Sequence, residues 1–192
     1  MSSLVFKYRG LLWGVFALAI LFLPVSGSPL RFAVSVPLLA AGQALRFWAA
    51  GVIPKYRTLV VDAPVLVTHG PYAAIRNPLY AGNAIMGFGW SLMAGWPWVL
   101  AFAAAFSVVY SMIIIPWEER FLLQKFGESY AAYKKATPSL IPSITTAAAS
   151  VRKFRGGFDA GKSWAMERHS LRMNTTLTAL VLARLLWAFW TG

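Results

Sequence analysis

The stretch GPYAAIRNPLYAG, residues 70–82, places two prolines, two glycines, an arginine and an asparagine directly before an apolar run. Asn77 precedes Pro78, and the residue before a proline is biased away from the helical region. Asparagine is a good N-cap, and proline is favoured at the first helical position. The pattern therefore predicts a helix that begins at Pro78, with Asn77 as its cap. The positive end of that helix is suited to hold a carboxylate or another anion.

Composition indicates that lipid is the main solvent of this chain. Of its 192 residues, 58% are hydrophobic and 12% are charged, whereas a soluble domain carries about 25% charged residues. There is no cysteine, and His69 and His169 lie far apart in sequence, so we expect no metal site. The net charge of +12 favours basic loops that face an anionic cytoplasmic leaflet, and we expect no nucleic-acid partner.

Five apolar segments approach the roughly 20 residues that a spanning helix needs. They cover about residues 11–25, 32–53, 78–95, 98–117 and 175–190. The first segment also fits a signal peptide, with Lys7 and Arg9 before it and VSGS after it, but we expect it to be retained. Most Lys and Arg residues lie in residues 55–76 and 120–172. By the positive-inside rule, the N-terminus and any active site are predicted on the cytoplasmic side.

The predicted fold is an all-α, polytopic membrane helix bundle of about five transmembrane helices, forming one domain over residues 1–192. We divide it into an N-terminal helix pair (1–53), a core (54–142), a basic cytoplasmic linker (143–172) and a C-terminal transmembrane helix (173–192). Residues 118–135 predict a cytoplasmic amphipathic helix, with Gly127 as a candidate interruption. Its spacing places one set of side chains along a single stripe: Glu119, Leu122, Phe126, Tyr130 and Tyr133.

Charged residues are predicted to meet at one end of a helical hairpin. Arg76 stands just outside the helix that begins at Pro78, and Glu118 and Glu119 follow the next helix, across a tight AGWP turn. Arg76 could be a snorkelling side chain or form a merely structural pair. Ionisable groups in a bundle interior are nevertheless a functional hypothesis by default. Gly82, Gly87 and Gly89 permit close approach of a ligand or, as we prefer, of another helix.

Two linked motifs carry a family resemblance. GPYAAIRNPLYAG is followed by a hydrophobic hairpin and then by EERFLLQKFGESYAAYKKATPSLIP. Over residues 66–142 this arrangement resembles the isoprenylcysteine carboxyl methyltransferases and the related phospholipid methyltransferases. The resemblance implies S-adenosylmethionine as cofactor, held in a pocket on the cytoplasmic side of the bundle. It also implies a lipid-like substrate that enters from the membrane.

The resemblance also implies roles for single residues. The residues expected to line the cofactor are Thr68, His69, Gly70, Tyr72, Asn77, Pro78, Tyr80 and Glu118. Arg76 would bind a carboxylate of cofactor or substrate, and together with Glu119 it forms the predicted catalytic pair. Either Glu118 or Glu119 would meet the cofactor's amino group or orient the acceptor.

The acceptor is left open between a lipid or isoprenoid carboxylate and a phospholipid amine. Asn77 stands where isoprenylcysteine enzymes often have histidine, which weakens the case for a carboxylate acceptor. A carboxylate needs no base, whereas an amine must lose a proton, which a nearby glutamate can accept.

Two other classes of function remain as alternatives. One is a membrane reductase that uses NADPH, because sterol reductases share a similar core. The other is a non-enzymatic scaffold or transporter. A transporter should show midplane ionisable groups, and Arg184 is the midspan candidate, with no acidic residue evident within the predicted membrane segments.

Overall fold

In the computed structural model, residues 2–22, 28–54, 63–152 and 157–191 are described, and they form helices and turns without a strand. The helices are α1 (Ser2–Phe22), α2 (Pro29–Val52), α3 (Pro71–Ala74), α4 (Pro78–Ala94), α5 (Trp96–Phe106), the π-helix η1 (Ser107–Ile114), α6 (Ile115–Ala136), α7 (Ile144–Arg152) and α8 (Ala160–Thr191). The all-α prediction is confirmed.

The helix predicted at Pro78 begins at that residue. It ends at Gly95, whose φ of 125° is readily accessible only to glycine. The predicted hairpin between α4 and α5 is therefore built on this residue. Beyond it, α5, η1 and α6 form one continuous helix from Trp96 to Ala136, so the two helices predicted on either side of residue 118 are joined. The predicted interruption is present, because Gly127 has φ 53° and ψ −129°.

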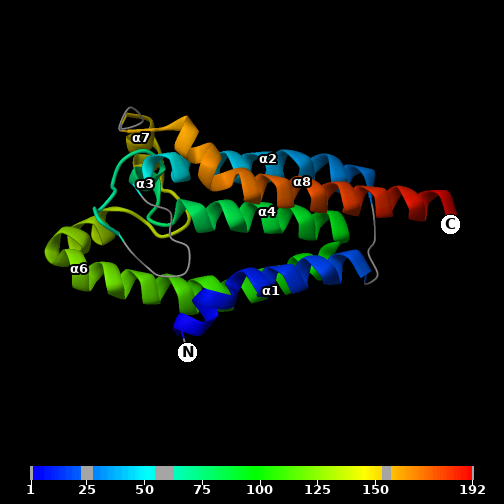
Figure 1. Ribbon diagram of the computed structural model, residues 1–192, viewed down its shortest axis with the longest axis horizontal. Coiled ribbons are helices and arrows are strands. Elements are labelled where there is room, and N and C mark those ends of the chain that lie inside the picture. Colours follow the sequence, from blue (N-terminus) through cyan, green and yellow to red (C-terminus); the bar gives the residue numbers. More distant parts are fainter. Residues whose placement is uncertain (1, 23–27, 55–62, 153–156, 192) are drawn as a thin grey trace.

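The long helices lie roughly side by side in an elongated bundle (Figure 1). α2 lies against both α4 and α8, and α1 lies against η1. α2 and α4 approach closely because a Cβ atom on Gly42 would lie 2.8 Å from the Gly82 carbonyl oxygen. A Cβ atom on Gly87 would lie 2.1 Å from the Phe102 ring. Gly82 and Gly87 therefore serve helix packing, as preferred from the sequence, and Gly42 is their counterpart on α2.

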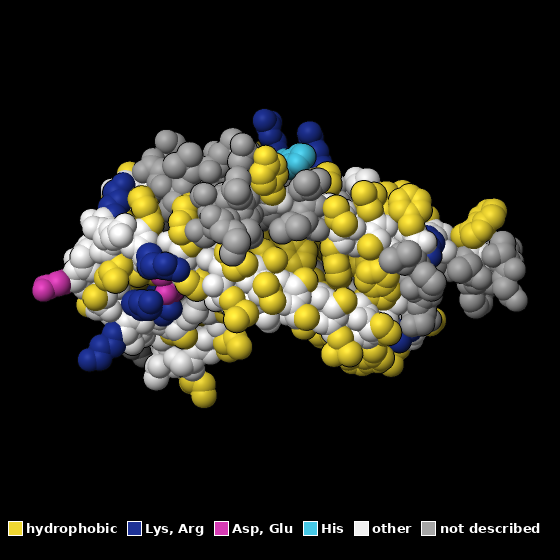
Figure 2. All heavy atoms as spheres, turned by 90° about the horizontal axis from the view of Figure 1, so that it is seen from below, with side chains coloured by type: hydrophobic (Ala, Val, Ile, Leu, Met, Phe, Trp, Pro, Cys, Tyr) yellow, Lys and Arg dark blue, Asp and Glu magenta, His cyan; other side chains and the backbone are white. Residues whose placement is uncertain are grey.

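The face of the bundle shown in Figure 2 is largely apolar where its residues are described. Hydrophobic side chains cover much of the described surface over α1 and α5, whereas Lys and Arg gather at the α6 end (Figure 2). Among the described residues, α2 and the helix Trp96–Ala136 are long and apolar enough to cross a membrane. The count of five spans and the membrane position of residues 118–135 stay predictions.

Most of the segment predicted as a linker, residues 143–172, is helical. α7 occupies Ile144–Arg152, and α8 begins at Ala160 and continues to Thr191. The start of α8 is held by Asp159, whose Oδ1 accepts a hydrogen bond from the Lys162 backbone N–H at 2.9 Å. The segment lacks an apolar run, but it buries the polar side chains of Ser163 and Glu167. The sequence prediction missed this helix because its inner face is polar.

Candidate active site

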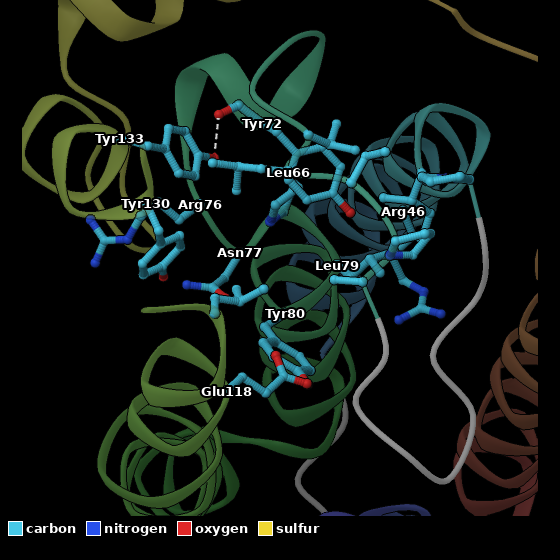
Figure 3. A pocket seen from close by; sticks show the side chains of 18 of the residues that line it. Arg46, Leu66, Tyr72, Arg76, Asn77, Leu79, Tyr80, Glu118, Tyr130 and Tyr133 are labelled. Carbon is cyan, nitrogen blue, oxygen red and sulfur yellow. Dashed lines mark hydrogen bonds between the residues drawn. The ribbon is translucent and has the colours of Figure 1, made fainter. Parts of the chain in front are cut away.

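A cavity lies between the chain before α3, the start of α4 and the face of α6 (Figure 3). Its wall combines four tyrosines, two arginines, two asparagines and one glutamate with apolar residues. The lining residues are Arg46, Ile53, Pro54, Ala63, Pro64, Val65, Leu66, Val67, Tyr72, Arg76, Asn77, Pro78, Leu79, Tyr80, Asn83, Glu118, Leu122, Tyr130 and Tyr133.

Most of the predicted site residues meet in this cavity. Its wall contains Tyr72, Arg76, Asn77, Pro78, Tyr80 and Glu118. The other predicted residues, Thr68, His69, Gly70 and Glu119, are not among its lining residues. At Gly70 the backbone has φ 58°, a conformation that favours glycine. The chain turns here, and the wall resumes at Tyr72.

Glu118 is the buried carboxylate of the cavity. Its residue is 3% exposed, and its Oε1 accepts a hydrogen bond of 2.8 Å from the Tyr80 hydroxyl. The Tyr80 ring in turn packs against the Tyr110 ring, with 4.7 Å between centroids. Glu118 lies near the start of α6 and Tyr80 in the first turn of α4, so the α4–α5 hairpin brings them together. Of the two candidate glutamates, Glu118 is the one that reaches the cavity.

Glu119 instead belongs to a salt-bridge cluster at the rim. Arg76 donates to Glu119 Oε1 through Nε at 2.9 Å and Nη2 at 2.7 Å, and Lys134 Nζ lies 2.8 Å from Glu119 Oε2. Arg76 Nη1 also donates to the carbonyl oxygens of Lys134 and Thr137. These contacts engage much of the guanidinium and tie the chain before α4 to the end of α6. They favour the structural interpretation of Arg76, and its predicted role as a carboxylate binder stays untested.

Asn77 occupies the cap position of α4, but its side chain does not cap the helix. Asn77 Nδ2 donates to Ser139 Oγ at 3.1 Å, and the Asn77 backbone N–H donates to the Ser139 carbonyl at 3.0 Å. The neighbouring Arg76 N–H donates to the Pro138 carbonyl at 2.9 Å. Asn77 is thus the N-cap residue of α4, as predicted, but its side chain fastens the segment after α6 to the start of α4.

Aromatic residues of α6 form the opposite wall. Leu122, Tyr130 and Tyr133, three members of the predicted stripe, line the cavity. Tyr133 donates its hydroxyl proton to the carbonyl oxygen of Tyr72 at 2.7 Å (Figure 3). The periodicity of the stripe already indicated that these side chains share one face of the helix, although they were not predicted as site residues.

Arg46 and Asn83 are site residues that the sequence reasoning missed. Arg46 Nη1 donates to Asn83 Oδ1 at 2.6 Å. Arg46 also forms two hydrogen bonds to Glu167 of α8, from Nε to Oε2 at 2.9 Å and from Nη2 to Oε1 at 2.7 Å. An arginine within an apolar helix requires a partner when buried, and that requirement was the available signal. Arg184, the ion that the sequence did single out, donates to the Ile20 carbonyl.

Comparison with known proteins agrees with the resemblance. A family model described as phospholipid methyltransferase matches residues 30–129, which is more than half of the chain. The protein-S-isoprenylcysteine O-methyltransferase of Schizosaccharomyces pombe is 38% identical over 81 residues, covering 42% of this chain and 34% of that protein. Protein-S-isoprenylcysteine O-methyltransferase A of Arabidopsis thaliana is 39% identical over 82 residues, covering 41% and 40%.

A more distant similarity concerns the reductase alternative. The steroid 5-alpha-reductase DET2 of Solanum lycopersicum is 28% identical over 109 residues, covering 55% of this chain and 40% of that protein. No solved structure matches the chain. The matched segments span two fifths or less of these three relatives. The family match covers α2 through most of α6, the helices that build most of the cavity, and the chain belongs to the phospholipid methyltransferase family.

Proposed function

We propose that the chain is an integral membrane methyltransferase that transfers a methyl group from S-adenosylmethionine to a lipid-like acceptor. The observation that carries the proposal is the buried Glu118 carboxylate, held by Tyr80 in a cavity that the family-matched segment largely builds. When bound, S-adenosylmethionine supplies an electrophilic methyl group on a sulfonium. The protein needs to hold donor and acceptor in line and to exclude water.

The side chains of the cavity fit this cofactor. A carboxylate such as Glu118 attracts a cationic group, and tyrosine rings attract cations through their faces. Tyr72, Tyr130 and Tyr133 offer flat apolar surfaces for an adenine ring, and Asn77 and Asn83 line the same cavity with amide groups suited to hydroxyls. This donor set supports a cofactor that combines a positive charge with a nucleoside.

Glu118 is the residue to which we assign the acid–base role. With an amine acceptor, Glu118 would take the proton that the amine must lose when it receives the methyl group. With a carboxylate acceptor no proton moves, and Glu118 serves to orient the donor. Arg76 and Glu119 hold the rim of the cavity in both cases.

The acceptor is proposed to reach the cavity from the bilayer. The two apolar helices α2 and Trp96–Ala136 both contribute to the wall. Lys and Arg side chains gather at the α6 end (Figure 2), and by the positive-inside rule this supports a cytoplasmic location for that end. The names of the relatives favour an isoprenylcysteine carboxylate, and that of the family favours a phospholipid.

Ligand-induced stabilisation tests this proposal. S-adenosylhomocysteine at about 100 times its dissociation constant should add about 2.7 kcal/mol to the free energy of unfolding. For a chain of this size the melting temperature of the detergent-solubilised protein should rise by about 5–11 °C. NADPH at the same concentration should leave it unchanged. A rise with NADPH and none with S-adenosylhomocysteine would establish the reductase alternative, and no rise with either would favour a scaffold or transporter.

A further inference from the structure

The carboxylate that balances Arg46 comes from a helix outside the family match. Glu167 lies in α8, whereas the match ends at residue 129. The Glu167 residue is 1% exposed and Arg46 is 7% exposed, and two hydrogen bonds join their side chains. Gln43 Nε2 adds a third hydrogen bond to Glu167 Oε2, at 3.2 Å. The ion pair is buried, and both carboxylate oxygens of Glu167 accept hydrogen bonds.

The position of α8 on α2 is fixed by contacts other than this pair. Ser163 Oγ donates to the Phe47 carbonyl oxygen at 2.8 Å, and the Asp159 backbone N–H donates to the Gly51 carbonyl at 3.1 Å. A Cβ atom on Gly51 would lie only 2.3 Å from Ser163 Oγ, so the two helices touch there. Glu167 lies one turn further along α8, and these contacts with α2 place it next to Arg46.

The ion pair joins the cavity wall to α8. Arg46 lines the cavity together with Tyr80, Asn83 and Glu118, whereas Glu167 is not among the lining residues. Glu167 thus places a negative charge next to a cationic residue of the cavity wall. Replacing Glu167 by a neutral residue would make this wall more positive by one charge, in surroundings of low dielectric constant, where charges interact over longer distances than in water.

A sulfonium methyl donor is sensitive to such a charge. The donor carries a positive charge on sulfur, and the thioether that remains after methyl transfer does not. A positive wall therefore weakens binding of the donor more than binding of the product.

We propose that Glu167 is a positioning residue of the site: it fixes and neutralises Arg46, and so allows the cavity to accept a cationic methyl donor. This inference rests on the proposed function. It makes α8 a functional part of the site, and the selectivity between donor and product depends on a residue outside the family core.

The test compares the dissociation constants of S-adenosylmethionine and S-adenosylhomocysteine, measured by calorimetry on the full chain in detergent. In Glu167→Gln the affinity for the cationic donor should fall roughly ten- to twentyfold more than that for the product, if the charges lie about 10 Å apart at an effective dielectric constant of about 20. Arg46→Gln leaves the negative charge of Glu167 in place. In this variant the ratio of the two dissociation constants should change in the opposite direction. The double variant should restore the wild-type ratio.

Controls separate this inference from the proposed function. Glu128→Gln removes an exposed carboxylate of α6 and should leave both constants unchanged. If one single variant fails to fold, the direction in which the ratio of the two dissociation constants changes in the other variant still tests the inference. Equal losses for both ligands would refute the charge-balancing role of Glu167 and leave the proposed function intact. A wild-type protein that binds neither ligand would refute the proposed function itself.

Discussion

Replacing Arg76 by alanine should destabilise the fold, and this is the sharpest test of the contacts at the rim. Arg76 and Glu119 have side chains that are 10% and 8% exposed and lie 2.7 Å apart. Removal of one partner from a buried ion pair costs about 3–5 kcal/mol. Because Lys134 still contacts Glu119, we expect the lower end, about 3 kcal/mol. The variant also loses the hydrogen bonds to the carbonyls of Lys134 and Thr137.

The melting temperature in detergent measures this effect. A loss of about 3 kcal/mol corresponds to a fall of about 6–12 °C for a chain of this length. Lys134→Ala is the matched control: its side chain is 49% exposed, and exposed pairs contribute about 0–1 kcal/mol. If Arg76→Ala melts as the control does and yet loses methyl transfer, Arg76 contacts a ligand and does not brace the rim.

Five further substitutions test other parts of the site and the fold. Glu118→Gln keeps a hydrogen-bond acceptor and should preserve the melting temperature, but with an amine acceptor it should lower kcat/KM at least about 100-fold; unchanged turnover would exclude Glu118 as the base. Gly42→Ala should destabilise the chain by about 1–3 kcal/mol in chemical unfolding, because its Cβ would lie 2.8 Å from a carbonyl oxygen of α4. Gly14→Ala, with nothing within 4 Å, should stabilise α1 by about 0.5–1 kcal/mol. Asn77→Ala and Ser139→Ala should each cost about 1 kcal/mol, and additive losses in the double variant would show that the pair is not coupled.

Local signals made the hairpin and one wall of the cavity predictable. Pro78 sets the start of α4 and Gly95 its end, and both residues act through their own backbone geometry. The combined length of α5 and η1 then brings Glu118 back to the end of the hairpin at which α4 begins. The sequence could not separate Glu118 from Glu119, because neighbouring helical residues point about 100° apart and only the packing of α6 decides which one faces Tyr80.

Long-range pairing explains what the sequence did not reveal. Arg46 and Glu167 are 121 residues apart, and neither stands in a motif. Residues 160–172 contain more polar than apolar side chains, so hydrophobic periodicity gave no reason to place them against the bundle. They pack there because α2 presents the buried cation Arg46, which pairs with Glu167, and the Phe47 carbonyl oxygen, which accepts a hydrogen bond from Ser163. A buried charge on an apolar helix should therefore prompt a search for its counter-ion along the whole chain, including segments that look like linkers. In this chain such a search leads from Arg46 in α2 to Glu167 in α8.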